Sequence, residues 1–544
     1  MKKILTILFI SVFTISYTQI NYEIVEGEPT KGKTRGSGFI GIDDNGYIYT
    51  QSYKYTYALV TYIVRPFIKV FNASTGEMHA EFPLEKIPGL KARGLKYKDI
   101  DFIDDKATII CTDKVTQKPM RFYGVHIDQN GELVGERFEI GVSPECKGLF
   151  RQGNYSPRGI NYQKMSDGTF TFVSDISCSS DELKTFQVID LDESLEVKNS
   201  FTFSLEYDRV SNLSMAESGD FLYLKATTSV KEKVEGKLLK RWIVTPRLFK
   251  IRLKDGSIEE IPFQDNVVEP LSIGDFRIKP VSQGILLSGQ ILKDKKFSGI
   301  FTAIYEEATN QVVDVNVQDF DAEFVTQYWS ERQKRKTEKR KNRKGETLDD
   351  EDFSGDFLLM EAYETADNGL ISVYQEFDLR IVTRTTTDAN GVTTTTTDYY
   401  YYYKDVIIVK TDENGKIAYT KLFPFYQLTV NYDPGIGYTS MRDGNDIYFL
   451  HGTSNVMEEM IEEGKKSNRK TRFRDRAIRY GSITRLTESG DVSTEQVLDL
   501  SELRISIDPS VVGSDEDNKQ FVILSPVMKM FNRKKTRMIR IEIK

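Results

Sequence analysis

The sequence predicts an all-β protein in which pairs of short antiparallel hairpins repeat along the chain. One hairpin can be followed residue by residue at 405–425, DVIIVKTDENGKIAYTKLFPF. Apolar residues occupy both sides of its first strand, and Asn414-Gly415 supplies the left-handed turn that joins two twisted strands. Approximate copies of this hairpin recur from end to end. The 12% aromatic content and only 15 prolines in 544 residues are typical of a strand-rich globular protein.

Two classes of hairpin alternate along the chain. Inner hairpins, such as YQKMSDGTFTFVS, are expected to turn near Gly46, Asp105, Gly168, Gly219, Gly284, Gly369, Gly444 and Asp515. Outer hairpins, such as VHIDQNGELVGERF, are expected to turn near Gly76, Gly131, Glu193, Gly256, Asn310, Gly415 and Gly490. Each inner and outer pair makes four short strands, and this unit repeats roughly every 50 to 85 residues.

The two ends of the chain complement each other. After the last inner hairpin, residues 536–544, TRMIRIEIK, form one alternating strand with Ile539, Ile541 and Ile543 on a single face. Residues 20–26 form another lone strand before the first inner hairpin. Pairing of the two strands would complete an eighth unit and would remove the open edges of a broken array.

The repeat layout and the terminal pairing resemble the β-propeller superfamily over residues 19–544. This resemblance implies a single ring of eight four-stranded blades, with seven blades as the alternative count, closed by the N- and C-terminal strands. The chain lacks the specific signatures of the WD40, kelch and sialidase Asp-box families. The resemblance therefore implies a fold and no activity, since many functions share one fold.

Residues 1–18 are predicted to be a secretory signal peptide. Lys2 and Lys3 form a basic start, Ile4 to Ile15 form a short apolar core, and Ser16 and Thr18 suit a cleavage site. The alternative is a membrane anchor, but the apolar run falls short of the ~20 residues that span a bilayer. We expect a bacterial protein that is exported to the periplasm, the outer-membrane surface or the extracellular space, with no integral membrane segment after cleavage.

A phosphate-binding pattern occurs by chance at residues 27–34. GEPTKGKT fits G-x-x-x-x-G-K-[ST], but that chemistry needs a helix that begins at Lys33. The next residues, RGSGFIGIDDNGYIYTQ, predict another hairpin instead. The net charge of −7 also argues against a nucleic-acid partner. Nothing in the sequence predicts a cofactor or a metal site, and the Asp-rich turns DDNG, DENG and GSDEDN lack the glutamate of a calcium loop.

Long insertions are predicted at about 325–355, 379–404 and 454–479. They fall between inner and outer hairpins or between repeats, and in a propeller those two loop classes share one face. We expect a hairpin at Arg380 to Lys404 that turns at Asn390-Gly391, and a short capped helix from Asn455 to Gly464. One face should therefore be elaborated, and loops of this kind often carry binding residues.

The insertions hold most of the candidate binding residues. The run RQKRKTEKRKNRK at 332–344 and the run KKSNRKTRFRDR at 465–476 suggest a site for an anionic partner. The favoured alternative for the first run is a solvated, partly disordered loop that is neutralised by the acidic residues after it. The candidate residues are Trp329, Arg335, Lys336, Arg340, Arg472 and Arg474.

Five consecutive tyrosines form the second candidate surface. Because alternate side chains of a strand face opposite sides, the run could present a flat aromatic surface to a sugar or a protein. Packing against Thr393 to Thr397 across the hairpin is an equally weighted alternative. The candidates are Tyr399, Tyr400, Tyr401, Tyr402 and Tyr403.

The three cysteines are too few for a disulfide scaffold. Cys146 and Cys178 both fall in predicted loops of the elaborated face, where a disulfide is possible in an exported protein. Cys111 lies in the apolar strand IICTD and is expected to be a buried thiol.

The function cannot be specified further than two hypotheses. The first is an exported propeller that acts as a binding or scaffold module for a protein or a surface glycan. The alternative is a propeller enzyme, a hydrolase or lyase, that acts on polysaccharide; no catalytic residue can be named. Carboxylates and basic groups that converge on the central channel would favour the enzyme, whereas an apolar or Ser/Thr lining would favour the binding module.

Overall fold

The computed structural model describes most of the predicted repeat region. The described residues are 20–31, 35–58, 61–90, 92–113, 121–142, 160–165, 168–177, 183–233, 240–262, 272–293, 296–328, 331–343, 356–387, 393–425, 427–430, 437–453, 480–503, 507, 512–526 and 535–544. Several expectations lie outside them, namely the signal peptide, Lys33, Cys146, Cys178, Trp329, Arg472, Arg474 and the capped helix at 455–464.

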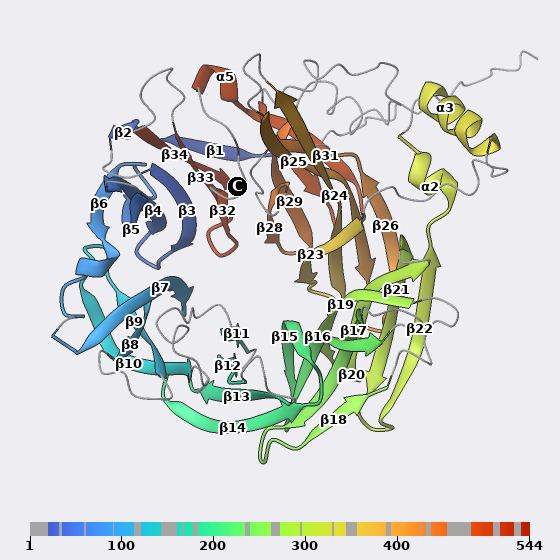
Figure 1. The fold of residues 1–544 in the computed structure, drawn as a ribbon, viewed down its shortest axis with the longest axis horizontal. Coiled ribbons are helices and arrows are strands. Elements are labelled where there is room, and N and C mark those ends of the chain that lie inside the picture. Colours follow the sequence, from blue (N-terminus) through green and yellow to red (C-terminus); the bar gives the residue numbers. More distant parts are fainter. Residues whose placement is uncertain are drawn as a thin grey trace, which may run out of the picture.

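The strands of the described residues form eight antiparallel sheets, which Figure 1 shows side by side around a common centre. Sheet 1 contains β3 (Arg35–Ile42), β4 (Tyr47–Ala58), β5 (Thr61–Asn72) and β6 (Met78–Pro83); sheet 2 contains β7 (Leu95–Ile103), β8 (Lys106–Asp113), β9 (Arg121–Ile127) and β10 (Leu133–Val142). Sheet 3 contains β11 (Ile160–Lys164), β12 (Phe170–Asp175), β13 (Lys184–Leu191) and β14 (Val197–Leu205); sheet 4 contains β15 (Arg209–Ser218), β16 (Phe221–Lys233), β17 (Lys240–Arg252) and β18 (Ile258–Ile261).

The second half of the chain continues the pattern with sheets 5 to 8. Sheet 5 contains β19 (Ser272–Val281), β20 (Gly284–Lys293), β21 (Lys296–Glu306) and β22 (Gln311–Asp319); sheet 6 contains β23 (Asp356–Glu364), β24 (Leu370–Thr387), β25 (Thr393–Thr411) and β26 (Ile417–Phe423), with β27 (Gln427–Val430) beside β25. Sheet 7 contains β28 (Thr439–Asp443), β29 (Asp446–Thr453), β30 (Tyr480–Leu486) and β31 (Val492–Asp499); sheet 8 contains β32 (Val512–Asp515), β33 (Gln520–Pro526), β34 (Lys535–Ile543) and β1 (Tyr22–Glu26), with β2 (Thr30–Lys31) beside β34.

The turns of the hairpins agree with the sequence prediction. Each turn residue predicted for the inner and outer hairpins lies at or beside the turn between two paired strands, whereas Asn390-Gly391 lies outside the described residues. At the β25–β26 turn, Gly415 has φ of 74°, and Asp412 Oδ1 accepts hydrogen bonds from the backbone N–H groups of Asn414 and Lys416 at 3.0 and 2.9 Å. Asp128 and Asp192 bind their own turns in the same way. These carboxylates therefore stabilise turns, as the Asp-rich sequence requires.

The predicted pairing of the chain ends is confirmed. β1 lies antiparallel to β34 over five residue pairs, with Ile24 opposite Ile541. On its other edge β34 pairs with β33, where Ile541 lies opposite Phe521. The eighth sheet thus takes β1 and the short β2 from the start of the chain and three strands from the end.

Apolar clusters join each sheet to the next. One cluster spans sheets 1 and 2, and further clusters follow in order through sheets 7 and 8. A last cluster joins sheet 8, through Val522 and Leu524, to sheet 1, through Ile48 and Phe71. This arrangement of eight four-stranded sheets is consistent with an eight-bladed β-propeller.

Close packing near the centre depends on glycines that face aromatic rings. A Cβ atom at Gly41 in sheet 1 would lie 2.3 Å from Cγ of Phe102 in sheet 2. A Cβ atom at Gly513 in sheet 8 would lie 2.1 Å from the ring of Phe39 in sheet 1. In two neighbouring pairs of sheets, a phenylalanine ring of one sheet therefore occupies the volume that a side chain at the glycine of the other sheet would fill.

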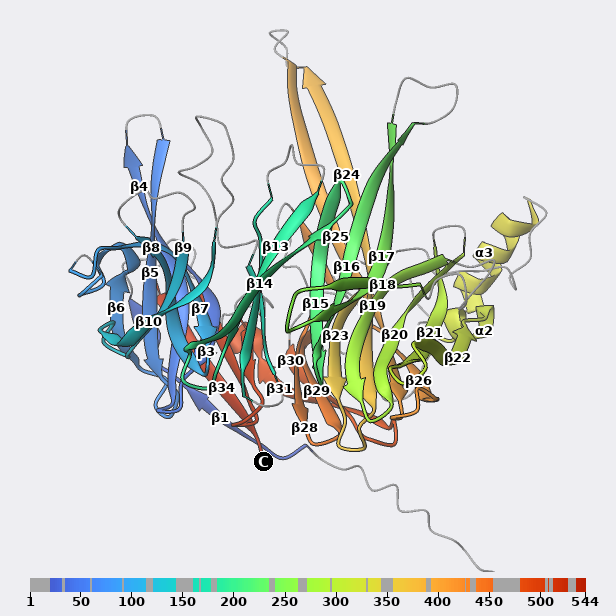
Figure 2. The same cartoon turned by 90° about the horizontal axis from the view of Figure 1, so that it is seen from below.

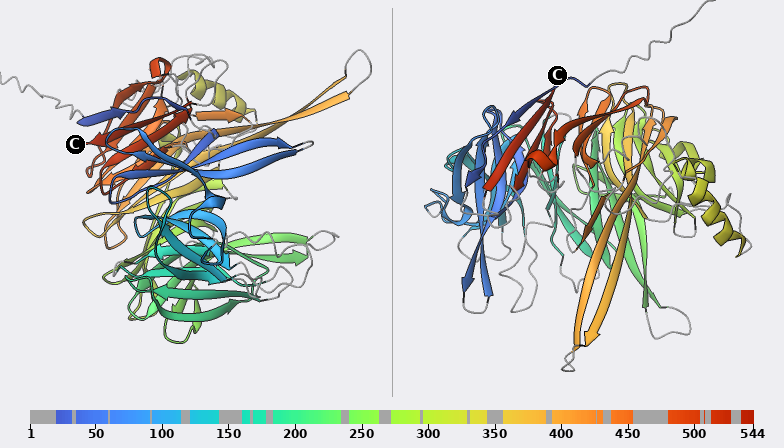
Figure 3. Two further views of the ribbon diagram at one scale, coloured as in Figure 1. Left: turned by 90° about the vertical axis from the view of Figure 1, so that its left-hand side faces the viewer. Right: turned by 90° about the horizontal axis from the view of Figure 1, so that it is seen from above.

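One face of the molecule, the elaborated face, carries long hairpins, one of which is the hairpin expected at Arg380 to Lys404. Figure 2 shows the hairpins β4–β5, β16–β17 and β24–β25 extending on the same side of the sheets, and both views of Figure 3 agree. The β24–β25 hairpin is the longest, with strands of 18 and 19 residues.

The helices are few and lie between sheets. They are η1 (Leu84–Lys86), α2 (Ala322–Thr326), α3 (Glu331–Asn342) and α5 (Leu500–Leu503). No helix within the described ranges is long and apolar enough to cross a membrane. After the phosphate-binding pattern the chain enters strand β3 at Arg35 rather than a helix, in agreement with the prediction. Cys111 is fully buried in β8, as expected.

Candidate functional site

The first basic run forms a helix, so its interpretation as a partly disordered loop is wrong. Helix α3 covers 12 residues, ERQKRKTEKRKN, and nearly all of them belong to types with high helix propensity. Arg335 and Lys336 are exposed, and Arg340 lies on the same helix. Because Arg472 and Arg474 lie outside the described residues, no convergence of the two basic runs can be drawn from the structure.

The five tyrosines lie on β25 where the β24–β25 hairpin leaves its sheet. Their exposure falls towards the sheet, from 40% at Tyr399 to 1% at Tyr403. Tyr403 packs against the ring of Phe377 with centroids 5.3 Å apart. The run therefore contributes to the core at Tyr403 and is exposed to solvent at Tyr399.

The alternative that these rings pack on Thr393 to Thr397 is wrong. Those threonines precede the tyrosines on the same strand, and they face Thr383 to Thr387 of β24. The partners of the tyrosines are instead residues 377–381; Tyr399 lies opposite Ile381 and Tyr401 opposite Leu379. One strand of 19 residues holds both runs, so the threonines and the tyrosines pair with different parts of β24.

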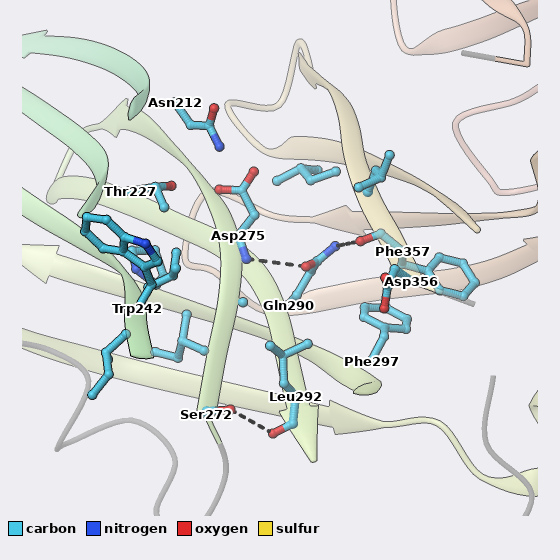
Figure 4. Close-up of a pocket in the computed structure, with 17 residues that line it drawn as sticks. Asn212, Thr227, Trp242, Ser272, Asp275, Gln290, Leu292, Phe297, Asp356 and Phe357 are labelled. Atoms are coloured by element: carbon cyan, nitrogen blue, oxygen red, sulfur yellow. Dashed lines mark hydrogen bonds between the residues drawn. The ribbon is translucent and has the colours of Figure 1, made fainter. Parts of the chain in front are cut away.

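The most developed candidate site is a pocket of about 730 Å³ between sheets 4, 5 and 6. Its residues come from β15, β16 and β17 of sheet 4, from β19, β20 and β21 of sheet 5, and from β23 of sheet 6. Figure 4 shows Trp242 and Thr227 on one side of the pocket, Phe297 and Asp356 on the other, and Asp275 between them. The volume lies in the usual range for small-molecule sites, which also combine apolar walls with a few polar groups. The other lining residues are Asn212, Ile243, Val244, Pro246, Ser272, Ile273, Gly274, Gln290, Leu292, Phe357, Leu358 and Leu359.

Two β-bulges direct polar side chains at this pocket. The pairing of β15 with β16 is irregular between Ser211 and Ser214, and Asn212 inside this bulge has φ of 51°. The pairing of β19 with β20 is irregular between Ile273 and Phe276, which places Asp275 in a second bulge. Bulges redirect side chains, and a non-glycine residue with positive φ stores strain. Each of these two bulges therefore places a polar residue, Asn212 or Asp275, in the lining of the pocket.

A buried lysine holds Asp275 in place. The side chain of Lys225 is 2% exposed, and its Nζ forms an ion pair with Oδ1 of Asp275. The same Nζ donates to the backbone carbonyl of Asn212 at 3.3 Å, while the N–H of Phe276 donates to Asp275 Oδ1 at 3.0 Å. Burial lowers the pKa of Lys225, and the carboxylate of Asp275 opposes this shift. The pair leaves Asp275 Oδ2 as an acceptor with no partner among the described residues.

Gln290 fixes the floor of the pocket. Its Oε1 accepts from the N–H of Asp275 at 3.3 Å, and its Nε2 donates to the carbonyl of Phe357 at 2.7 Å. A Cβ atom at position 274 would lie 2.8 Å from this Oε1, so Gly274 leaves the room that the contact requires. Sheets 5 and 6 are thus joined directly beneath the pocket.

Trp242 forms the aromatic wall and is flanked by two cations. Arg209 Cζ lies 4.1 Å from the centroid of its ring, and Lys231 Nζ lies 4.7 Å from it. Cations at these distances are attracted to the indole face. Neither cation lines the pocket, so they hold the ring rather than fill the cavity.

A second polar group lies on the innermost strands of sheets 6 and 7. Glu361 Oε2 accepts hydrogen bonds from Tyr363 Oη at 2.8 Å and from Ser440 Oγ, while Tyr363 Oη also lies 2.7 Å from Ser440 Oγ. Burial raises the pKa of Glu361, and the two hydroxyl hydrogen bonds oppose this shift. The positive charge of Arg277 also favours the charged form of Glu361. Charged residues of both signs therefore occupy the innermost strands.

No set of three or more His, Cys, Asp or Glu side chains in the described ranges is arranged to hold a metal ion. The polar groups of the pocket are suited to hydrogen bonds instead. Asn212, Thr227 and Asp356 have no hydrogen-bond or ion-pair partner through their side chains within the described residues, and all three line the cavity.

Sequence reasoning missed this site, although one signal was present. Lys225 stands between Leu224 and Ala226 in the strand FLYLKATTSV, and a lysine in an apolar strand requires a buried partner. Its partner lies 50 positions later in a bulge of the next sheet. Bulge positions depend on tertiary packing and have no sequence signature here, so Asp275 could not be identified as the partner.

Comparisons with known proteins add little. No family model matches the chain, and no curated protein matches it. Solved structures with some similarity include polysaccharide lyase Uly1, at 10% identity and a TM-score of 0.30 over 98% of this chain and 94% of that chain. An acylaminoacyl peptidase is similar at 11% identity and a TM-score of 0.31, over 94% of this chain and 59% of that chain. Bacteroides ovatus Xyloglucan PUL GH43B is similar at 8% identity and a TM-score of 0.21, over 96% of each chain. At these scores the likenesses carry no argument about this chain.

Proposed function

We propose that this protein is a closed eight-bladed propeller that is exported and binds carbohydrate in the pocket between sheets 4, 5 and 6. The pocket itself carries the proposal: it combines the Trp242 wall with several hydrogen-bonding groups that have no partner among the described residues. An indole face suits the C–H face of a sugar ring, and carboxylate, amide and hydroxyl groups suit its hydroxyls. The signal peptide expected at residues 1–18 supports export.

The Trp242→Ala variant should bind oligosaccharide about tenfold more weakly or worse than the parent, because it removes the aromatic wall of the pocket. The measurement is isothermal titration with the best ligand from a panel of soluble plant, bacterial and animal glycans. Tyr399→Ala is the matched control, since it removes an exposed aromatic ring on the same face outside the pocket.

Equal loss of affinity in both variants, or no loss in Trp242→Ala, would argue against the pocket. The same mixtures should be examined for shortened oligosaccharides, because charged residues on the innermost strands favour the enzyme hypothesis. If the parent cleaves an oligosaccharide and a folded Glu361→Gln variant does not, the function is catalysis rather than binding.

The β24–β25 hairpin supports a protein partner as a second function. Beyond the sheet, one face of this ribbon carries Leu379, Ile381, Tyr399, Tyr401 and six threonines, with no charged residue. Ile381 is 56% exposed and Leu379 is 42% exposed. The opposite face carries the charged residues of the ribbon, among them Arg380 and Arg384. An uncharged face with exposed apolar side chains is typical of a protein contact surface.

The Ile381→Glu variant should lose its partners in pull-downs from cell-envelope extracts, because it places a charge in the uncharged face. Thr386→Glu is the control, since Thr386 lies on the opposite face of the same ribbon. Both positions are exposed, so the melting temperature should stay within about 2 °C of the parent in each case. The same partners with both variants would show that the uncharged face is not the contact.

A further inference from the structure

The charge of the pocket narrows the class of sugar that fits it. Of the 17 lining residues, two carry a formal charge, and both are aspartates: Asp275 and Asp356. Among the described residues, the pocket thus has no basic lining residue to receive a carboxylate or sulfate group of a ligand. Three cations lie near the lining but outside it: Lys225 pairs with Asp275, and Arg209 and Lys231 lie against the ring of Trp242.

The two aspartates have different charge environments. The charge of Asp275 is offset by Lys225, which is almost fully buried behind it. Asp356, at the start of β23, has no ion-pair partner among the described residues and is exposed. The lining therefore carries a net negative charge, located at Asp356 across the cavity from Trp242 (Figure 4).

We propose that the pocket selects a sugar unit that bears a free ammonium group, which pairs with Asp356 while its ring stacks on Trp242. This inference rests on the proposed carbohydrate-binding function and specifies its ligand. Asp275, fixed by Lys225 and by the bulge of β19, then serves as a neutralised acceptor for ring hydroxyls. An acidic sugar would bring its carboxylate towards Asp356 with no cation in the lining to receive it, and should be excluded.

The test compares sugars that differ in charge and little else. Oligomers of glucosamine, of glucose and of glucuronic acid share one ring configuration and are cationic, neutral and acidic; a galactose-configured set is measured beside them. At low salt, the amino oligomer should bind about five- to tenfold more tightly than the neutral one, as expected for one partly exposed ion pair. The acidic oligomer should bind most weakly, and added salt should reduce the preference for the amino form.

The Asp356→Asn variant should remove the preference for the amino oligomer and leave the affinity for the neutral oligomer nearly unchanged. Asp378→Asn is the control, because Asp378 is an exposed carboxylate on the ribbon outside the pocket. Neutral or acidic oligomers that bind as tightly as the amino form, or a preference that survives Asp356→Asn, would overturn this inference alone. A folded protein that binds none of the oligomers in either configuration would overturn the proposed function together with it.

Discussion

Deletion of residues 536–544 should abolish the cooperative unfolding transition of the protein. These residues form nearly all of β34, which pairs with β1 and β2 on one side and with β33 on the other. Their loss would leave β1 with no partner strand in its sheet and would open the apolar cluster between sheets 7 and 8, which includes Ile539, Ile541 and Ile543. The removal of a core element exceeds the effect of an ordinary substitution, and proteins have only about 5–15 kcal/mol of stability to lose.

A point substitution in β34 tests the same contact with a smaller expected loss of stability. Ile541→Ala should lower the free energy of unfolding by about 2–5 kcal/mol, the usual cost of truncating a buried isoleucine. Lys544→Ala, at the exposed end of the chain, should change it by less than about 0.5 kcal/mol. Equilibrium unfolding in guanidinium chloride provides the measurement. A truncated protein that unfolds at the same denaturant concentration as the parent would contradict the pairing of the chain ends.

Gly41→Val should destabilise the protein by about 1–3 kcal/mol or more, the usual cost of overpacking a filled site. The added Cβ atom would lie within 2.6 Å of three carbon atoms of the Phe102 ring. These atoms belong to the base of the ring, so a small rotation of Phe102 cannot relieve the clash. The substitution would instead force sheets 1 and 2 apart near the centre of the molecule.

Gly38→Ala provides the matched control for this substitution. Gly38 lies on the same strand, β3, and a Cβ atom there would meet nothing within 4 Å. The free energy of unfolding of the Gly38→Ala variant should stay within about 0.5 kcal/mol of the parent value. A stability of Gly41→Val equal to that of Gly38→Ala would show that the glycine–phenylalanine contact does not set the spacing of the sheets.

The turns could be predicted because their signals are local. An Asp that binds its own turn, followed by a Gly with positive φ, marks a hairpin wherever it stands, as at Asp412 and Gly415. The terminal pairing followed from counting hairpins. Helix α3 was missed because its charge suggested a solvated loop, whereas its residue types favour a helix.

The pocket could not be predicted because its geometry depends on irregularities. Regular alternation assigns each residue of a strand to one of two faces, but Asn212 and Asp275 occupy bulges where that rule fails. Trp242 belongs to the β16–β17 hairpin, and its place in the same lining as Asp275 follows from the packing of sheet 4 on sheet 5. The partners assigned to the tyrosines were wrong for another reason: the threonines at 393–397 lie on the same strand as the tyrosines and pair with Thr383 to Thr387.

The pairing of β1 with β34 also sets the order in which the molecule can be made. Seven sheets use strands that are close in sequence, so they can form while synthesis continues, whereas β1 must wait for the last residues of the chain. At about 5–20 residues per second, that wait lasts roughly 25 to 100 seconds. Throughout this time the first strand has an unpaired edge, which is open to proteases and to strands of other molecules. A chain that stops before β34 never supplies the partner strand of β1, so the edge of β1 is covered only in molecules that contain β34.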